Sequence, residues 1–161
     1  MKRKIKREQN SEKKEELSYV VEIKDWDFSY TFSVNWDERF FDGPFWEHLG
    51  IEGKGKIMCP EKLKDKEIVI KIFANRRAVH ILNNPEDYRH SEPSKAVGEL
   101  TIRGKKSEFH GAVPFDAFHT LCSMLVAGKI KYLILYGGAL HRGFAEIKSM
   151  DLQEHLGSED L

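Results

Sequence analysis

Apolar and polar residues alternate one by one along much of this chain, and this period of two limits the possible folds more than any other feature. The clearest case is WDFSYTFSVNW, residues 26–36, in which every second side chain is large and apolar. Successive side chains of a β-strand point to opposite faces, so this pattern predicts strands with one apolar face. Similar segments are LSYVVEIKD (17–25), EIVIKIFAN (67–75), VGELTIRG (97–104), SEFHGAVP (107–114) and a last pair between about 130 and 152.

One segment has the spacing of a long helix. PFDAFHTLCSMLVAGK, residues 114–129, begins with Pro and reaches Gly128, which are typical residues at the two ends of a helix. Its apolar stripe consists of Phe115, Phe118, Leu121, Cys122 and Leu125. About seven short strands around one helix of about 115–127 predict a mainly β fold, either an antiparallel two-sheet sandwich or a flattened barrel.

The chain divides into three parts by composition. Residues 1–16 hold seven Lys/Arg against four Glu, with a single apolar side chain after Met1, so we expect a disordered basic tail. Residues 17–155 are expected to form one globular domain, and residues 156–161 a loose end. The whole chain has 26 basic and 26 acidic residues, which leaves 19 basic and 22 acidic outside the tail. Nucleic acid is therefore an unlikely partner, and its association with the tail is a weaker alternative.

The sequence also indicates a compartment. The basic N-terminus continues with Glu, Gln and Asn where a signal peptide requires apolar residues. The longest apolar run has nine residues, whereas a membrane-spanning helix needs about 20. The two cysteines, Cys59 and Cys122, match no metal or redox spacing and predict a reducing environment. We expect a cytoplasmic protein without a membrane partner.

The aromatic row at 26–36 has two interpretations, a core face or a binding platform. Five exposed rings of about 150–250 Å² each would form a patch of about 1,000 Å², larger than the largest patch of most monomers. We therefore predict that Phe28, Tyr30 and Phe32 belong to the core. Trp26 and Trp36, at the strand ends, are the members that could stay open to a ligand or partner.

A second aromatic segment, ERFFDGPFWEHLG at 38–50, surrounds the turn DGP. It predicts either a hydrophobic plug that closes the domain or a surface that docks another protein. The candidate docking residues are Phe40, Phe41, Phe45 and Trp46.

Cationic side chains gather in residues 75–96, a connection longer than the 12–15 residues beyond which loops tend to be functional or disordered. Two more lie at a predicted hairpin tip, residues 137–142. Arg captures a carboxylate or phosphate with two hydrogen bonds, and His can complete such a site near neutral pH. The candidate residues for an anionic ligand are Arg76, Arg77, His80, Arg89, His90, His141 and Arg142.

Motifs of catalysis are absent from the sequence: it has no G-x-S-x-G, no P-loop and no G-x-G-x-x-G, and we name no catalytic residue. His90, Glu92 and His141 match the ligand types of a non-haem iron site, but the remaining context of such a site is missing, so we expect no metal and no cofactor. The leading hypothesis is a binding or adaptor domain that recognises a protein through loops. The alternative is a small enzyme or receptor for an anionic ligand, with a site between 75–96 and 137–142.

Overall fold

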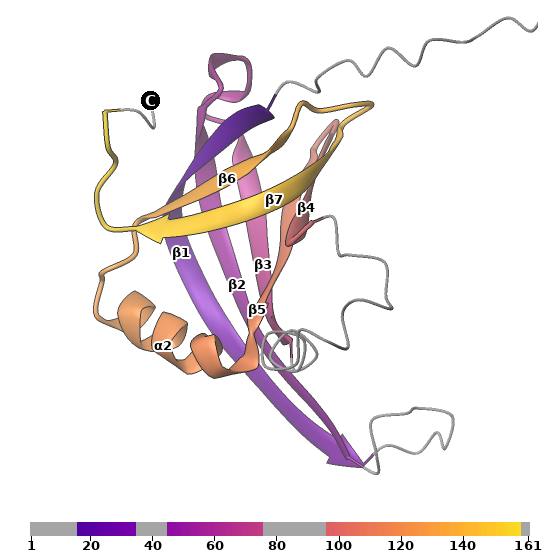
Figure 1. The fold of residues 1–161 in the computed structure, drawn as a ribbon, viewed down its shortest axis with the longest axis vertical. Coiled ribbons are helices and arrows are strands. Elements are labelled where there is room, and N and C mark those ends of the chain that lie inside the picture. The colour runs from indigo at the N-terminus through magenta and orange to yellow at the C-terminus, as the bar shows by residue number, and fades with distance from the viewer. Residues whose placement is uncertain (1–15, 35–44, 76–95, 159–161) are drawn as a thin grey trace, which may run out of the picture.

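The computed structural model describes residues 16–34, 45–75 and 96–158. Within these ranges seven strands close into a barrel with the order β1-β2-β3-β5-β4-β7-β6, accompanied by one α-helix (Figure 1). The strands are β1 (Glu16–Val34), β2 (Phe45–Cys59), β3 (Glu67–Asn75), β4 (Gly98–Arg103), β5 (Lys106–Pro114), β6 (Tyr132–Gly138) and β7 (Phe144–Gln153). The helix is α2 (Phe115–Val126), and a 3₁₀ turn, Glu61–Leu63, follows β2. The predicted mainly β fold with about seven strands and one helix is confirmed.

Two details of the prediction need correction. The barrel is mixed rather than antiparallel, because β5 lies between β3 and β4 and runs parallel to β3. β1 begins at Glu16, so the expected tail extends one residue too far. Glu16 pairs with Gly138 of β6, and its carboxylate forms an ion pair with Lys148.

Alternate residues of each strand fill the barrel. Ile68, Ile70 and Ile72 of β3 are each 2% exposed, and they meet inward-facing residues of the other strands in one continuous core. Phe109 of β5 is completely buried beside two glycines that face each other across β4 and β5. A Cβ placed on Gly98 or Gly111 would come within 2.7 or 2.5 Å of the Phe109 ring. Glycine is therefore required at both positions for the ring to lie against the backbone.

Helix α2 lies below β6 and β7 in Figure 1 and beside the lower part of β1. Phe118, Leu121 and Leu125 are buried in the barrel core, and Phe115 and Cys122 pack against it, which confirms the predicted apolar stripe. Gly128, just beyond the helix, has a φ of +67°, a left-handed conformation that suits glycine. The helix closes the lower end of the barrel.

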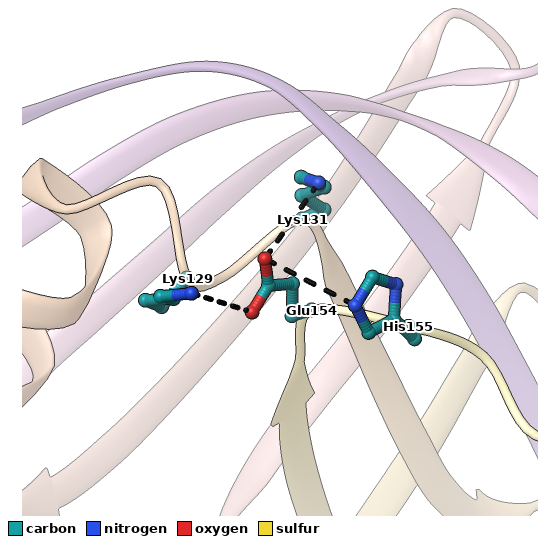
Figure 2. Close-up of polar contacts among 4 residues, drawn as sticks. All are labelled: Lys129, Lys131, Glu154 and His155. Carbon is teal, nitrogen blue, oxygen red and sulfur yellow. Dashed lines mark hydrogen bonds and ion pairs between the residues drawn. The ribbon is translucent and has the colours of Figure 1, made fainter.

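The segment after α2 is tied to the end of β7 (Figure 2). The amide of Lys131 donates to the carbonyl of Gln153, and its own carbonyl accepts from the amide of Ile23, both at 2.8 Å. Next to these bonds, the Glu154 carboxylate lies 3.2 Å from Lys129 Nζ and 4.0 Å from Lys131 Nζ. The hydrogen bond from Lys129 holds the pKa of Glu154 below its ordinary value.

Strands β1 and β2 continue past the rest of the barrel as a two-stranded hairpin, residues 25–34 and 45–49, which we call the arm (Figure 1). β1 pairs with β6 only as far as Glu22, and β2 pairs with β3 only from Gly50 onward. Among the described residues, therefore, no third strand accompanies the arm.

A β-bulge at Lys24 sets which side of the arm is apolar. Ile23 lies opposite Gly55 and Asp25 lies opposite Lys54, so that Lys24 is the extra residue. Before the bulge the odd-numbered residues of β1, such as Val21, face the core. After it the even-numbered residues do, beginning with Trp26, which packs against the core.

Candidate functional site

The arm carries a row of uncovered apolar side chains on the same side as the barrel core. Phe28 lies directly opposite Ile51, and Tyr30 lies opposite Leu49. Because paired residues of neighbouring strands share a face, the row continues the inner surface of the barrel. The row consists of Phe28, Tyr30 and Phe32, each 58% exposed, Phe45 at 55% and Val34 at 49%.

The prediction that Phe28, Tyr30 and Phe32 are core residues is wrong. It assumed a second sheet facing the strand, but the sheet closes on itself as a barrel and the arm projects beyond it. Helix α2 reaches only the base of the arm. Trp26 is the partly buried member of the aromatic row, and Trp36 lies outside the described residues.

Among the four predicted docking residues, Phe45 belongs to this row. Its ring stacks on Phe32 with centroids 5.4 Å apart. Phe45 therefore extends the apolar face of the arm instead of plugging the barrel. Trp46 follows it in β2, whereas Phe40 and Phe41 lie outside the described residues.

A groove of about 400 Å³ separates the base of the arm from α2. The His119 ring at its helical side lies edge-on to Phe118, with centroids 6.4 Å apart. Burial raises the pKa of the Cys122 thiol, so this cysteine stays protonated and serves as a small apolar wall. The main lining residues are Phe28, Tyr30, Leu49, Phe118, His119 and Cys122.

Two backbone donors of the arm are already occupied. The amide of Trp26 donates to Oδ1 of Asp25 at 2.9 Å, and the amide of Phe28 donates to Oδ1 of Asp27 at 2.8 Å. These amides are not free to pair with an added strand. Such protection of a strand edge limits edge-to-edge association.

The charged residues around the row have one sign. Residues 25–34 and 45–53 contain four carboxylates, from Asp25, Asp27, Glu47 and Glu52, and no Lys or Arg. Helix α2 has Asp116 as its single Asp, Glu, Lys or Arg, and its solvent side exposes Met124 at 39% and Val126 at 72%. Glu47 shares the face of Phe32, whereas Asp25, Asp27 and Glu52 belong to the opposite face of the two strands. An apolar centre with few charges and acidic residues around it has the composition of a protein interface.

The candidate anion site is not assembled among the described residues. His141 and Arg142 are exposed in the β6–β7 connection, where the Arg142 carbonyl accepts a hydrogen bond from Nε of Arg103 at 3.1 Å. Arg103 is the last residue of β4, whereas the described chain resumes at Ala96, before the first residue of that strand. The other five candidates lie outside the described residues: Arg76, Arg77, His80, Arg89 and His90.

The β6–β7 connection brings few cationic groups together among the described residues. The pocket beside it, about 540 Å³, includes His141 but not Arg142. Its one Lys or Arg side chain, Lys148, pairs with Glu16.

The described part of the chain holds no group of three or more His, Cys, Asp or Glu placed to bind a metal ion. His90 and Glu92 lie outside it. None of the helices in residues 16–34, 45–75 and 96–158 has the length and apolar character needed to cross a membrane. Comparisons of the chain with protein-family models, with curated proteins and with solved structures find no match.

Sequence reasoning selected Phe45 as a candidate and considered the row at 26–36 as a platform, but it favoured a core role for Phe28, Tyr30 and Phe32 and did not foresee the contribution of α2. One signal was present. Residues 16–34 contain no Gly, Pro or Asn, so Asp and Ser were the only turn-favouring residues that could separate the predicted strands 17–25 and 26–36. A single strand of 19 residues is about 60 Å long at about 3.3 Å per residue, which exceeds what a small barrel can cover.

Proposed function

We propose that this protein is a docking domain that binds another protein through the apolar face of the arm and the adjoining side of α2. The observation that carries the proposal is the exposed row from Phe28 to Val34 with Phe45 on the neighbouring strand. The barrel core does not include these rings, so they are not exposed core residues that the fold itself needs to bury. Their position on a projecting hairpin makes them accessible to a partner.

The size of this surface suits a stable interface. Five large side chains of about 200 Å², each about half exposed, offer about 500 Å² of mostly apolar area. A standard interface buries about 800 Å² on each partner, so the row supplies its centre and the exposed side of α2 the remainder. Aromatic residues with few central charges are enriched in such centres.

The acidic residues around the row also bear on the class of partner. Nucleic acid and membranes rich in anionic lipid are repelled by carboxylates, which supports a protein as the partner. The small-anion alternative has no comparable support, because five of its seven candidate residues lie outside the described residues.

The experiment compares two faces of the same strand in the full-length protein. Tyr30→Ser with Phe32→Ser removes two rings from the apolar face. Thr31→Ala with Ser33→Ala alters the opposite, exposed face and is the matched control. Proteins retained from cell extract by the unaltered chain are identified and purified, and the dissociation constant of each is measured by calorimetry against both variants.

We expect at least one purified partner to bind the apolar-face variant ten or more times more weakly than the unaltered protein, a loss of about 1.4 kcal/mol. The same partner should bind the control variant with unchanged affinity. Both variants must keep the circular dichroism spectrum and melting temperature of the parent. The proposal fails if every purified partner binds both variants with equal affinity.

A further inference from the structure

We infer that the occupant of this surface is a basic amphipathic helix of the partner protein, lying along the arm with one apolar side chain in the groove beside α2. The inference rests on the proposed docking function and specifies the chemistry of its partner. Three observations carry it: the dimensions of the row, the occupied edge amides and the sign of the charges.

The dimensions suit a helix. From Phe28 to Val34 the row extends over six residue steps, about 20 Å at about 3.3 Å per step. A helix that rises about 1.5 Å per residue covers this length with about 13 residues, close to the average helix of globular proteins. Its apolar stripe, at positions i, i+3, i+4 and i+7, would meet the rings in turn. The groove between Phe28, Leu49 and Phe118 would receive the side chain nearest the barrel.

The edge of β1 makes a strand a poor occupant. A peptide that extends a sheet depends on main-chain hydrogen bonds to an open edge. In the arm, Asp25 and Asp27 already hold the amides of Trp26 and Phe28. The apolar face has no such requirement, because a helix satisfies its own backbone groups internally.

The charges favour a basic helix. Asp25, Asp27 and Glu52 line a second depression, of about 380 Å³, on the arm beside Phe28, with Lys54 as the single base among its lining residues. Glu47 lines the groove beside α2. Glu47 shares the face of the row, so Lys or Arg on the flanks of a helix seated there would pair with it and would be attracted across the edge of the arm by Asp25, Asp27 and Glu52. Such attraction raises the association rate and fixes orientation. A second copy of this chain would instead bring two sets of the same carboxylates together.

The test uses full-length protein and fluorescent synthetic peptides of about 18 residues, about five helical turns. The probe has Leu along one helical face and Lys on its flanks. One control keeps the Leu face and replaces Lys by Glu. The other keeps the composition of the probe but permutes it so that no apolar stripe remains. Anisotropy is measured at about 50 and about 300 mM salt, between which the screening length falls about twofold.

We expect the probe to bind at least about ten times more tightly than either control and to weaken at the higher salt. Tyr30→Ser with Phe32→Ser should abolish this preference, while Thr31→Ala with Ser33→Ala should preserve it. Asp27→Asn with Glu47→Gln should weaken the probe and flatten its salt dependence, since each removes a charge and leaves the rings in place.

Four results would overturn the inference. Equal binding of the permuted peptide would reduce the interaction to unspecific charge attraction, and equal binding of the acidic peptide would remove the charge preference. Absence of binding by all three peptides would exclude a helix, while the docking function would still be decided by the purified partner. Finally, preferential binding to phosphatidylcholine vesicles would identify a membrane as the occupant, and dimerisation in sedimentation would identify a second copy of the chain. In either case, the variant Tyr30→Ser with Phe32→Ser should lose that binding.

Discussion

Phe32 and Phe45 stack across the two strands of the arm, with ring planes 24° apart, although each ring keeps more than half of its surface exposed. They are diagonal neighbours, because Phe32 lies opposite Glu47 and Phe45 lies opposite Val34. An aromatic pair of this kind contributes about 0.5–1.5 kcal/mol beyond the area that it buries. The stack therefore helps to hold the hairpin in register and presents a preordered surface, which would lower the entropic cost of the proposed binding.

The arm should contribute little to the stability of the barrel. We expect Phe32→Ala to lower the free energy of unfolding by about 1 kcal/mol, the value of its stacking contact. Phe109→Ala, at a fully buried position of the same residue type, should lower it by about 3–5 kcal/mol. Urea denaturation followed by circular dichroism measures both. Equal losses would show that the Phe32 ring is covered in solution.

The pair of glycines under Phe109 should not tolerate a methyl group. In Gly111→Ala the new Cβ would lie 2.5 Å from Cζ of Phe109, so we expect a loss of about 1–3 kcal/mol through overpacking. Gly138→Ala is the control, because a Cβ there meets nothing within 4 Å. Adding Phe109→Leu to Gly111→Ala should cost less than the sum of the two single changes. Strict additivity in denaturant unfolding would contradict the contact.

Ser107 should be replaceable with a gain in stability. Its side chain is 5% exposed and faces the barrel core, and its hydroxyl has no hydrogen-bond partner within the part of the chain that the structure describes. Burying an unpaired hydroxyl costs about 1–3 kcal/mol. We expect Ser107→Ala to raise the melting temperature, as measured by calorimetry. A lower melting temperature would indicate that the hydroxyl is paired in solution.

Glu154 should titrate below its ordinary pKa of 4.5 because Lys129 donates a hydrogen bond to it and the neighbouring positive charges favour the ionised form. A folded-state pKa below the unfolded value means that the interaction stabilises the fold above pH 4.5 and is lost as the pH falls through the lowered pKa. NMR titration of the Glu154 carboxyl measures this value. It should rise in Lys129→Met and stay unchanged in Lys105→Met, and no rise in the first variant would contradict the pairing.

Local patterns predicted the elements well, because they depend on neighbours in the sequence. Strand β3 and the apolar stripe of α2 were both predicted directly from residue spacing. Whether an apolar face is covered depends instead on where distant strands end. Phe28 and Phe109 both alternate with polar neighbours, yet the first is 58% exposed and the second is fully buried. The difference arises because β6 leaves β1 at Glu22 and β3 leaves β2 at Gly50, and neither point has a local signal near Phe28.

One part of the candidate site could be predicted from the sequence, because it too depends on neighbours in the chain. Phe45 was selected as a docking residue because aromatic residues cluster around it, and that cluster is visible in the chain itself. The α2 side of the groove could not be predicted, because Phe118 and Cys122 have the spacing of ordinary core residues. Their position beside the arm depends on how the helix closes the barrel. The parallel pairing of β3 with β5 depends in the same way on the path of the whole chain.

For the arm, the bulge at Lys24 matters more than the identity of the residue that occupies it. Lys24 is exposed and its ammonium pairs with Glu22, so exchanging it for another residue removes a surface ion pair that is worth little. If the strand instead ran through Lys24 without a bulge, the odd-numbered residues would keep facing the core beyond Ile23, and every later residue of β1 would be rotated by half a turn. The serines and the threonine of the arm would then face the side of the core, and the aromatic rings would face the outer surface. The bulge, one residue long, therefore decides whether the rings or the hydroxyl side chains of the arm lie on the side of the core.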